Sequence, residues 1–534
     1  MSRRWGPPLP ERHAHCAGLP DPFARPQLDH HAPSFALTPQ GPVVSSDAWS
    51  QRRLAILRGH TWQPVTADGW HREPRWAGGQ LFTLAHGRSE QSATGLAGAL
   101  PPGPPTSDWL QPVTEGLRLG EVHCWDGSRP LRPKRPATAM ALDPRGEPVH
   151  AQWQETGPGI LHWGQVRIAL PPGARVQDLA VSDDSRLCVI SLRSGQHLRT
   201  LCLTRQGKTV GPPTSLPVTG HAVWVSPSTV ALLVSTWPSV HPTLWNPHTG
   251  SIQTLNRDRV GVAETLGAAD DGQLAFSWTT PDTPRHLRRA ATDAPDPPPE
   301  RRAKASTTRQ ETIQGHQGPL PCLVQDPPAE PRGTVVLFHG GPNGAHYATW
   351  SALGESLTAA GWRVVRPNLQ GSRILDTTLA PGPPSRYGAE DVDDACLVTI
   401  RLGRGTLVVA GHSYGGYIAS RVAQRLPVVR GAVLISGFLR ITDLKESPEK
   451  QVGDFLHSPR VDPTLDPPHM PRTPHFVIHG DRDTRIPVAA MRRRSEHLPA
   501  GSEYVELPGE PHGLTSDTAA RAAIPRLFTW LDKR

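Results

Sequence analysis

One turn between an apolar run and an amphipathic run limits the folds open to this chain. Residues 406–410 (TLVVA) have the pattern of a buried strand, and residues 417–426 have the pattern of a helix. Between them lies the motif Gly411-x-Ser413-x-Gly415. Because glycines lack a side chain, they allow a strand and a helix to approach closely enough for such a tight turn. The motif therefore predicts a strand–turn–helix unit that raises the Ser413 hydroxyl above a sheet edge.

The residues around this motif predict a parallel sheet. The expected strands are residues 334–338, 363–366, 406–410, 432–435, 475–478 and 503–507, and the expected helices include residues 350–360 and 390–401. Continuous apolar strands that alternate with helices are typical of sheets covered on both faces. We therefore expect a doubly wound, mostly parallel α/β domain over residues 313–534.

The first half of the chain has a different period. Turn residues followed by a short alternating strand recur at intervals of 40, 43 and 45 residues. These turns begin at Asp143, Asp183, Ser226 and Asp271. The interval is the period of a four-stranded propeller blade, whose faces must be buried against neighbouring blades. We therefore expect a β-propeller-like domain of six or seven degenerate blades over residues 41–290, preceded by an N-terminal tail over residues 1–40. A pair of β-sandwich sheets is the alternative.

Residues 291–312 (ATDAPDPPPERRAKASTTRQET) separate the two patterns. They contain four prolines, charges of both signs and no apolar period. Such a composition is typical of a linker. Since a chain of 534 residues is also too long for one hydrophobic core, we expect residues 291–312 to link two domains.

The charge pattern excludes several classes of function. The chain has 56 basic and 48 acidic residues, a formal net charge of +8, but no basic stripe of the kind that nucleic acids require. The densest run, residues 492–494 (RRR), is expected to be a solvated face. No apolar run is long enough to span a membrane, and the N-terminal residues lack the apolar core of a secretory signal. We expect neither a nucleic-acid nor a membrane partner.

The six cysteines are scattered along the chain without a CxxC pair. Cys188 and Cys202 lie in apolar, strand-like runs, so we expect buried free thiols in a reducing compartment. This predicts a cytoplasmic protein. We expect no metal and no other cofactor, and a homo-oligomer is compatible with the sequence.

A serine hydroxyl needs a base to remove its proton and an acid to orient that base. In sheets of this kind the chain order is serine, acid, histidine. Asp481 and Asp483 both follow the expected strand 475–478, at the sheet edge that carries Ser413. His512 lies on a Pro/Gly loop after the next strand, whereas His497 falls on an expected helix. We therefore predict His512 as the base, and the spacing leaves both acids open.

A second glycine pair follows the expected strand 334–338. The sequence His339-Gly340-Gly341-Pro342 lies where such a sheet supplies a backbone N–H to a developing oxyanion. We predict two donors, the N–H of Gly341 and the N–H of Tyr414. Each such donor contributes about 3 kcal/mol of transition-state stabilisation. A phosphate-binding loop is the alternative, but its GK[ST] ending is missing.

Together these motifs resemble the catalytic domain of the prolyl oligopeptidase family, in particular its acylaminoacyl-peptidase and dipeptidyl-peptidase-like members. The matching segments are residues 339–342 (HGGP), 361–372 (GWRVVRPNLQGS), 411–417 (GHSYGGY), 479–487 (HGDRDTRIP) and 511–513 (PHG). The resemblance implies a β-propeller followed by an α/β-hydrolase domain. It also implies that the acid is the third residue after HG, which is Asp483, and that His512 is the base. Gln370 stands where the family often has an arginine, so substrate preference does not carry over.

The residues and the resemblance imply a serine peptidase that hydrolyses short peptides, of the aminopeptidase, acylaminoacyl-peptidase or oligopeptidase type, through an acyl-enzyme on Ser413. An esterase or a peptide-tailoring transacylase is the alternative, because the same triad does not distinguish water from an amine as second nucleophile. A propeller binding module with an inactive hydrolase domain is disfavoured, because all three triad residues are present. No acidic pair in the first half suggests a site for a free peptide amino terminus, so dipeptide release is not predicted.

Overall fold

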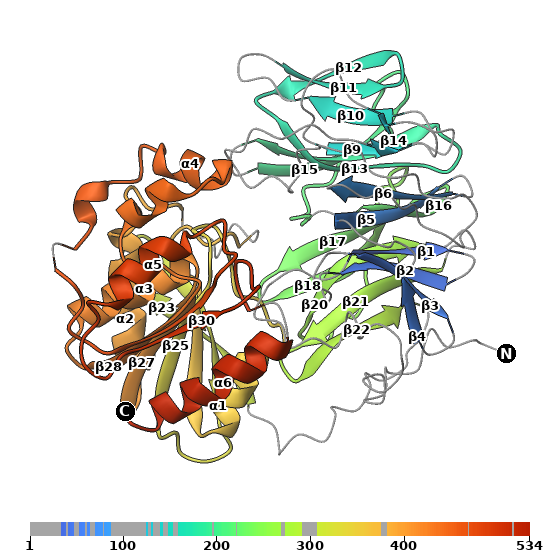
Figure 1. Cartoon of the computed structure of the whole chain (residues 1–534). Helices are drawn as coiled ribbons and strands as arrows, with labels where there is room; N and C mark the ends of the chain where they lie inside the picture. Colours follow the sequence, from blue (N-terminus) through green and yellow to red (C-terminus); the bar gives the residue numbers. More distant parts are fainter. Residues whose placement is uncertain are drawn as a thin grey trace. The chain divides into compact units, whose positions relative to one another are not determined.

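The computed structural model divides into two compact units (Figure 1). The first is built mainly from His31–Thr280, and the second mainly from Pro299–Arg534. The structure describes residues 34–38, 41–46, 53–58, 61–64, 70–77, 80–86, 124–125, 130–131, 139–142, 148–152, 158–194, 197–219, 222–268, 273–290, 307–374, 382–467, 469–514 and 517–534.

The second unit contains one eight-stranded sheet with the order β23-β24-β26-β25-β27-β28-β29-β30. Its strands are β23 (Thr307–Gln314), β24 (Pro319–Asp326), β25 (Gly333–Phe338), β26 (Trp362–Pro367), β27 (Thr406–His412), β28 (Val429–Ile435), β29 (His475–Gly480) and β30 (Glu503–Leu507). The pairs β23–β24 and β24–β26 are antiparallel, and all pairs from β26 to β30 are parallel. The loops after β25, β27, β29 and β30 therefore leave the sheet at the same edge, where ligands bind in open α/β sheets.

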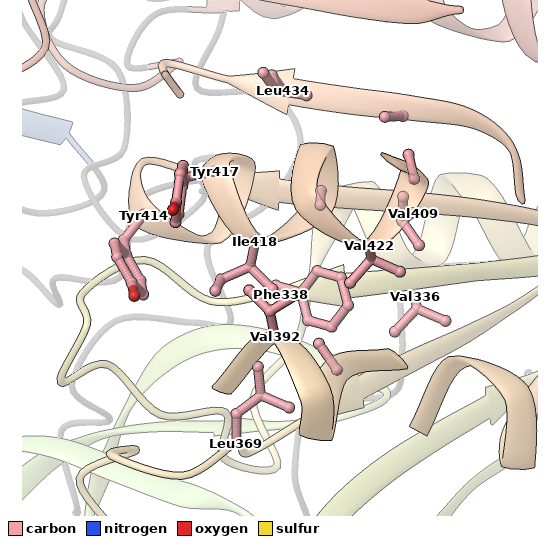
Figure 2. Close-up of a cluster of buried hydrophobic side chains, with 14 of the residues drawn as sticks. Val336, Phe338, Leu369, Val392, Val409, Tyr414, Tyr417, Ile418, Val422 and Leu434 are labelled. Carbon is pink, nitrogen blue, oxygen red and sulfur yellow. The ribbon is translucent and has the colours of Figure 1, made fainter. Parts of the chain in front are cut away.

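Both faces of this sheet are buried, and alternate residues of β25 show how. Val336 and Phe338 pack into one core, and Val335 and Leu337 pack into the other, as the two-residue period of a strand requires. Helices α2, α3 and α5 contribute to the first core, and α1 and α6 contribute to the second. Figure 2 shows Phe338 among the apolar side chains of α2 and α3 in the first core.

The helices of this unit are α1 (Ala352–Ala359), α2 (Glu390–Leu402), α3 (Tyr414–Arg425), α4 (Lys450–Leu456), α5 (Val488–Ser495) and α6 (Asp517–Leu531), with short 3₁₀ turns η2 (Ile441–Glu446) and η3 (Pro463–Leu465). None of the helices in the described ranges combines the length and apolar character that a bilayer crossing requires. All six expected strands are present, which confirms a doubly wound, mostly parallel sheet. The antiparallel pair β23–β24 was not expected.

Two strands lie in segments that we expected to be a linker and a tail. β23 covers residues 307–312 of the expected linker 291–312, and β1 (Ser34–Thr38) lies within the expected tail 1–40. Both are edge strands that pair on one side only. Because β23 is an edge strand, most of its residues can be exposed and polar. The sequence therefore lacks the alternation of apolar and polar residues that predicts a strand. Residues 291–306 lie outside the described part of the chain.

The first unit consists of antiparallel groups of consecutive strands. β1 to β4 and β9 to β12 form four-stranded sheets, β13 to β15 form a three-stranded sheet, and β16 to β22 form a larger one. The pairs β5–β6 and β7–β8 are two-stranded. A single parallel residue pair, Val240 with Val262, joins the group β16–β19 to the group β20–β22. The strands that follow the recurring turns, β10, β14, β17 and β21, are all present.

The strands of the first unit are β1 (Ser34–Thr38), β2 (Gly41–Ser46), β3 (Arg53–Arg58), β4 (Thr61–Pro64), β5 (Trp70–Ala77), β6 (Gln80–His86), β7 (Cys124–Trp125), β8 (Pro130–Leu131), β9 (Ala139–Leu142), β10 (Pro148–Gln152), β11 (Pro158–Trp163), β12 (Val166–Pro172), β13 (Arg175–Val181), β14 (Leu187–Ser194), β15 (His197–Thr204), β16 (Val223–Ser226), β17 (Thr229–Thr236), β18 (Ser239–Trp245), β19 (Ile252–Thr254), β20 (Val262–Ala268), β21 (Leu274–Thr280) and β22 (Thr283–Arg289).

Replacing Leu434 with alanine should destabilise the second unit. Leu434 of β28 is fully buried in the core of Figure 2, and Leu→Ala at such a position costs about 2–5 kcal/mol of unfolding free energy. Ile400 of α2 is 49% exposed, so Ile400→Ala should change that free energy by less than about 0.5 kcal/mol. Hydrogen exchange of residues 406–435 at increasing urea concentrations measures the unfolding free energy of both variants. Equal effects of the two substitutions would contradict the described core.

Candidate active site

The turn between β27 and α3 holds Ser413 in a strained conformation. Ser413 precedes α3 with a φ of 54°, a region that non-glycine residues rarely adopt. A Cβ on Gly411 would lie 2.1 Å from the carbonyl oxygen of Gly415, and a Cβ on Gly415 would lie 2.3 Å from the carbonyl oxygen of Phe338. Neither glycine can therefore be replaced without moving backbone. Strain of this kind costs about 1–3 kcal/mol and persists only where surrounding structure enforces it.

Asp483 and His512 form a hydrogen-bonded pair at the same sheet edge. His512 Nδ1 lies 2.8 Å from Asp483 Oδ2. The other carboxylate oxygen, Oδ1, accepts the backbone N–H groups of Arg485 at 2.9 Å and Ile486 at 2.8 Å. His479 Nε2 lies 3.3 Å from Oδ2. Asp483 is only 6% exposed, so these protein donors take the place of water around its charge.

The donors determine the protonation of Asp483. Burial alone would raise the pKa of the carboxyl, but hydrogen bonds from His479 and His512 outweigh burial and hold that pKa well below its usual range. The group is therefore a carboxylate at neutral pH, which can only accept a hydrogen bond. The proton of a neutral His512 then resides on Nδ1, and Nε2 is left with a lone pair to act as a base.

Asp481 and His497 lie outside this pair. Asp481 Oδ1 accepts the N–H of Gly509 at 2.7 Å, which connects the loop after β29 to the loop after β30. His497 is exposed just beyond the end of α5. The structure therefore brings Asp483, and not Asp481, to His512.

His512 lies beside the residue that precedes Ser413. The ring centroids of His412 and His512 are 4.9 Å apart. The N–H of Ser413 donates to the last carbonyl of β28 at 2.9 Å, and the N–H of Gly513 donates to Ser436 Oγ at 2.9 Å, so both loops are fastened to the end of β28. Within the described residues, Nε2 of His512 has no hydrogen-bond partner. Catalytic hydrogen bonds often tighten only when substrate is bound.

The glycine loop after β25 approaches the same serine. A Cβ on Gly340 would lie 3.5 Å from the Cβ of Ser413. Gly341 has a φ of 155°, and a Cβ there would lie 2.4 Å from the backbone nitrogen of Asn343, so only glycine fits. Tyr414 is the first residue of α3, and its N–H therefore has no earlier helical carbonyl to bond. The two expected oxyanion donors thus belong to the glycine loop that approaches the Cβ of Ser413 and to the residue that follows Ser413.

The loop that departs from the family pattern is buried. Gln370 is 4% exposed, and its side-chain amide donates to the side chain of Gln317, in the turn between β23 and β24. Asn368 is fully buried and makes two bonds to the backbone of His346, at 2.6 Å and 2.9 Å. In this chain the polar side chains of the loop therefore bond it to the β23–β24 turn and to the segment after β25.

A buried carboxylate beside the site, Asp391, was not expected from the sequence. Asp391 of α2 is 2% exposed, and its Oδ2 accepts the hydroxyl of Tyr414 at 2.6 Å. A signal was available, because Asp391 has helical spacing from Ala395 and Val398 and so lies on the apolar face of α2. An acidic residue on such a face needs a specific partner.

Other polar groups singled out in the sequence are accounted for by their neighbours. Arg492, Arg493 and Arg494 each pair with an acidic side chain. Cys188 and Cys202 are buried free thiols, as expected, and burial raises the pKa of Cys202 to about 12. Among the described residues, no group of three or more His, Cys, Asp and Glu side chains could hold a metal ion.

Comparison with known proteins agrees with the fold. Residues 333–460 match the family model described as the alpha/beta hydrolase fold. The second unit is an α/β hydrolase domain. Probable dipeptidyl-peptidase 5 of Emericella nidulans is 28% identical to the chain over 227 residues, which cover 37% of this chain and 31% of that relative. The acylamino-acid-releasing enzyme of Sus scrofa is 22% identical over 333 residues, which cover 53% of this chain and 45% of the enzyme. The chain thus spans less than half the length of these relatives.

Solved structures extend the likeness beyond the hydrolase domain. A puromycin-hydrolyzing peptidase of Mycobacterium tuberculosis has a TM-score of 0.71 and 16% identity, with 96% of each chain covered. The acylaminoacyl peptidase of Pyrococcus horikoshii has a TM-score of 0.64 and 16% identity, with 94% of this chain and 88% of that chain covered. At such identities the likeness concerns the fold. Together with the relatives above, it confirms the resemblance that the motifs indicate.

The contacts of the two acids predict different effects of their removal. Asp483→Asn should lower the rate of Ser413 labelling by a fluorophosphonate by about 10³- to 10⁴-fold, because an amide no longer selects the tautomer of His512 that has a free Nε2. Asp481→Asn keeps an amide oxygen that can still accept from Gly509, and should lower that rate by less than about tenfold. Active-site labelling followed by mass spectrometry measures both. A larger loss for Asp481→Asn would reverse the assignment.

Proposed function

We propose that this chain is a serine peptidase that hydrolyses short peptides through an acyl-enzyme on Ser413. The observation that carries the proposal is the 2.8 Å bond between His512 Nδ1 and Asp483 Oδ2, on loops that share a sheet edge with the strained Ser413 turn. Ser413 is the nucleophile, His512 the general base and acid, and Asp483 the residue that orients the imidazole. The names of similar proteins, a dipeptidyl-peptidase, an acylamino-acid-releasing enzyme and a puromycin-hydrolyzing peptidase, support peptides as the substrate class.

The proposed reaction has two halves. In the first, Ser413 Oγ attacks the peptide carbonyl carbon while His512 Nε2 takes the hydroxyl proton. His512 then gives this proton to the leaving amine, the C–N bond breaks, and the acyl group remains as an ester on Ser413. In the second half, water attacks the ester, His512 accepts the proton of the water and returns a proton to Ser413 Oγ, and the carboxylic product leaves. Asp483 stays ionised throughout and stabilises the imidazolium.

The N–H groups of Gly341 and Tyr414 are the proposed oxyanion donors. They come from the rigid glycine loop after β25 and from the first position of α3. Backbone donors held in this way need no reorganisation when negative charge develops on the carbonyl oxygen, and each contributes about 3 kcal/mol.

We also propose that residues 41–290 form a β-propeller-like domain of six or seven blades, joined by a linker to the hydrolase domain expected over residues 313–534, whose first strand, β23, begins at Thr307. Support comes from the order of the strands, because the antiparallel groups follow one another along the chain. In four of these groups the strand after the recurring turn is second, namely β10, β14, β17 and β21. The single residue pair that joins β18 to β20 fits two neighbouring blades better than one continuous sheet.

We propose a cytoplasmic location because several cysteines are free thiols. Cys188, Cys202 and Cys322 are buried, and none of them forms a disulfide within the described residues. Buried thiols of this kind fit a reducing compartment.

The function is tested by turnover that depends on Ser413. The full chain should hydrolyse aminoacyl- or acylaminoacyl-p-nitroanilides, and a fluorophosphonate should label it at Ser413. Ser413→Ala should abolish the labelling and lower kcat by about 10⁴-fold or more. The unfolding transition should be unchanged, because the substitution removes a single hydroxyl at a loop tip and leaves the described core intact.

A matched panel of p-nitrophenyl esters and free amines separates the peptidase from its alternatives. Hydrolysis of the anilides supports the peptidase. Turnover of esters alone would indicate an esterase, and efficient transfer of the acyl group to an added amine would indicate a transacylase. Either result would replace the proposed function.

The propeller is tested by an experimental structure of the full chain. Six or seven four-stranded sheets arranged around a central axis are expected within residues 41–290. Two sheets packed face to face would instead indicate the sandwich alternative.

A further inference from the structure

The first turn of α2 contains a buried carboxylate that the proposed reaction does not use. Asp391 is 2% exposed. Its Oδ1 accepts the backbone N–H groups of Gly388 at 2.8 Å and Val392 at 2.9 Å. Its Oδ2 accepts the hydroxyl of Tyr414 at 2.6 Å. One carboxylate therefore joins the start of α2 to the start of α3, two segments that are more than twenty residues apart in the chain.

Tyr414 is the residue that follows Ser413, so this bond acts on the nucleophile turn itself. The phenol ring is packed on several sides, with ring centroids 5.7 Å from Tyr417, 5.9 Å from Phe455 and 6.1 Å from Tyr387. Figure 2 shows Tyr414 and Tyr417 on the first turn of α3, at the end of the core that α2 shares. Ring packing limits where the side chain lies, and the hydroxyl bond fixes its end point.

The turn needs such support because its backbone is strained. The φ of 54° at Ser413 is unfavourable for serine and persists only where neighbouring contacts enforce it. The backbone N–H of Ser413 bonds to β28, and the carbonyl of Ser413 accepts the N–H of Gly416 at 2.9 Å. The hydrogen bond from the Tyr414 hydroxyl to Asp391 is a further attachment of this turn.

The charge state of Asp391 suits this task. Burial raises the pKa of its carboxyl to about 6, although the bonds from Tyr414, Gly388 and Val392 oppose the rise. Above that pKa the group is a carboxylate, and its hydrogen bond from the Tyr414 hydroxyl is charge-assisted and short. No product or substrate group is needed to satisfy it.

We propose that Asp391 is a positioning residue for the proposed reaction: through the hydroxyl of Tyr414 it holds the Ser413 turn and the N–H of Tyr414 in the geometry that attack and oxyanion binding require. This inference rests on the proposed function. A displacement of about 1 Å at a reacting group can cost on the order of 100-fold in rate, so loss of the bond should reduce kcat rather than substrate affinity.

Three substitutions test the bond. Tyr414→Phe keeps the ring and the backbone N–H but removes the hydroxyl, and Asp391→Ala removes the acceptor. Each should lower kcat about 10- to 100-fold with KM within about threefold of wild type. In Asp391→Asn the amide oxygen can accept from Gly388 and Val392 while the amide nitrogen donates to the phenol oxygen, so kcat should recover to within about threefold. The double variant Tyr414→Phe/Asp391→Ala should be no slower than the slower single variant.

A matched control lies on the same helix. Asp393 of α2 forms an exposed ion pair with Arg425 of α3, so it joins the same two helices away from the Ser413 turn. Asp393→Asn should leave kcat and KM unchanged. Losses that multiply in the double variant would overturn the proposal. If Asp391→Ala fails to fold, Tyr414→Phe alone decides, because wild-type kcat in that variant would also overturn the proposal.

Hydrogen exchange separates this inference from the proposed function, because it requires no turnover. Amides of residues 411–417 should exchange faster in Tyr414→Phe and Asp391→Ala than in wild type, Asp391→Asn and Asp393→Asn. Faster exchange in a chain without peptidase activity would support the positioning bond and reject the proposed function. Unchanged exchange in both Tyr414→Phe and Asp391→Ala would overturn the positioning bond.

Discussion

The close approach of three backbone segments positions Ser413. The end of β25, the end of β27 and the first turn of α3 meet where Gly411 and Gly415 lack side chains, and any Cβ there would lie 2.1–2.3 Å from a carbonyl oxygen. The path of the chain through Ser413 is thus imposed by sterics, including its φ of 54°. The glycine loop after β25 is brought to the serine by the same contact, since the carbonyl of Phe338 is one of the groups involved.

Hydrogen bonds determine the charge of Asp483. A carboxylate buried like Asp483 would ordinarily become neutral, but two backbone N–H groups and two histidines donate to it. The carboxylate then remains ionised and selects one tautomer of His512. At the start of α2, Asp391 is also buried and also satisfied by hydrogen bonds, but its donors are a phenol and two backbone amides, and its pKa is raised to about 6. The pKa values of two buried carboxylates in one domain thus shift in opposite directions because their donors differ.

The sequence predicted the parts of the domain that local pattern controls. Continuous burial and tight turns restrict residue type strongly. The sequence alone therefore predicts the apolar strands β25, β27 and β30 and the glycine spacing of the Ser413 turn. Edge strands were missed, because β23 is mostly exposed and its polar residues resemble a linker. The spacing left Asp481 and Asp483 open, because both follow the same strand and only the fold of the loop decides which one faces His512. Asp391 was missed because its partner, Tyr414, is distant in the chain.

The central claim is that Ser413 forms a covalent acyl intermediate with the help of His512 and Asp483. Rapid mixing of the full chain with a p-nitrophenyl ester of an acylated amino acid, followed by intact and peptide mass spectrometry, tests it most directly. We expect a burst of about one equivalent of p-nitrophenol per chain and the acyl mass on the peptide that contains Ser413. An acyl group found on another residue, or turnover that persists with Ser413 replaced by alanine, would contradict it.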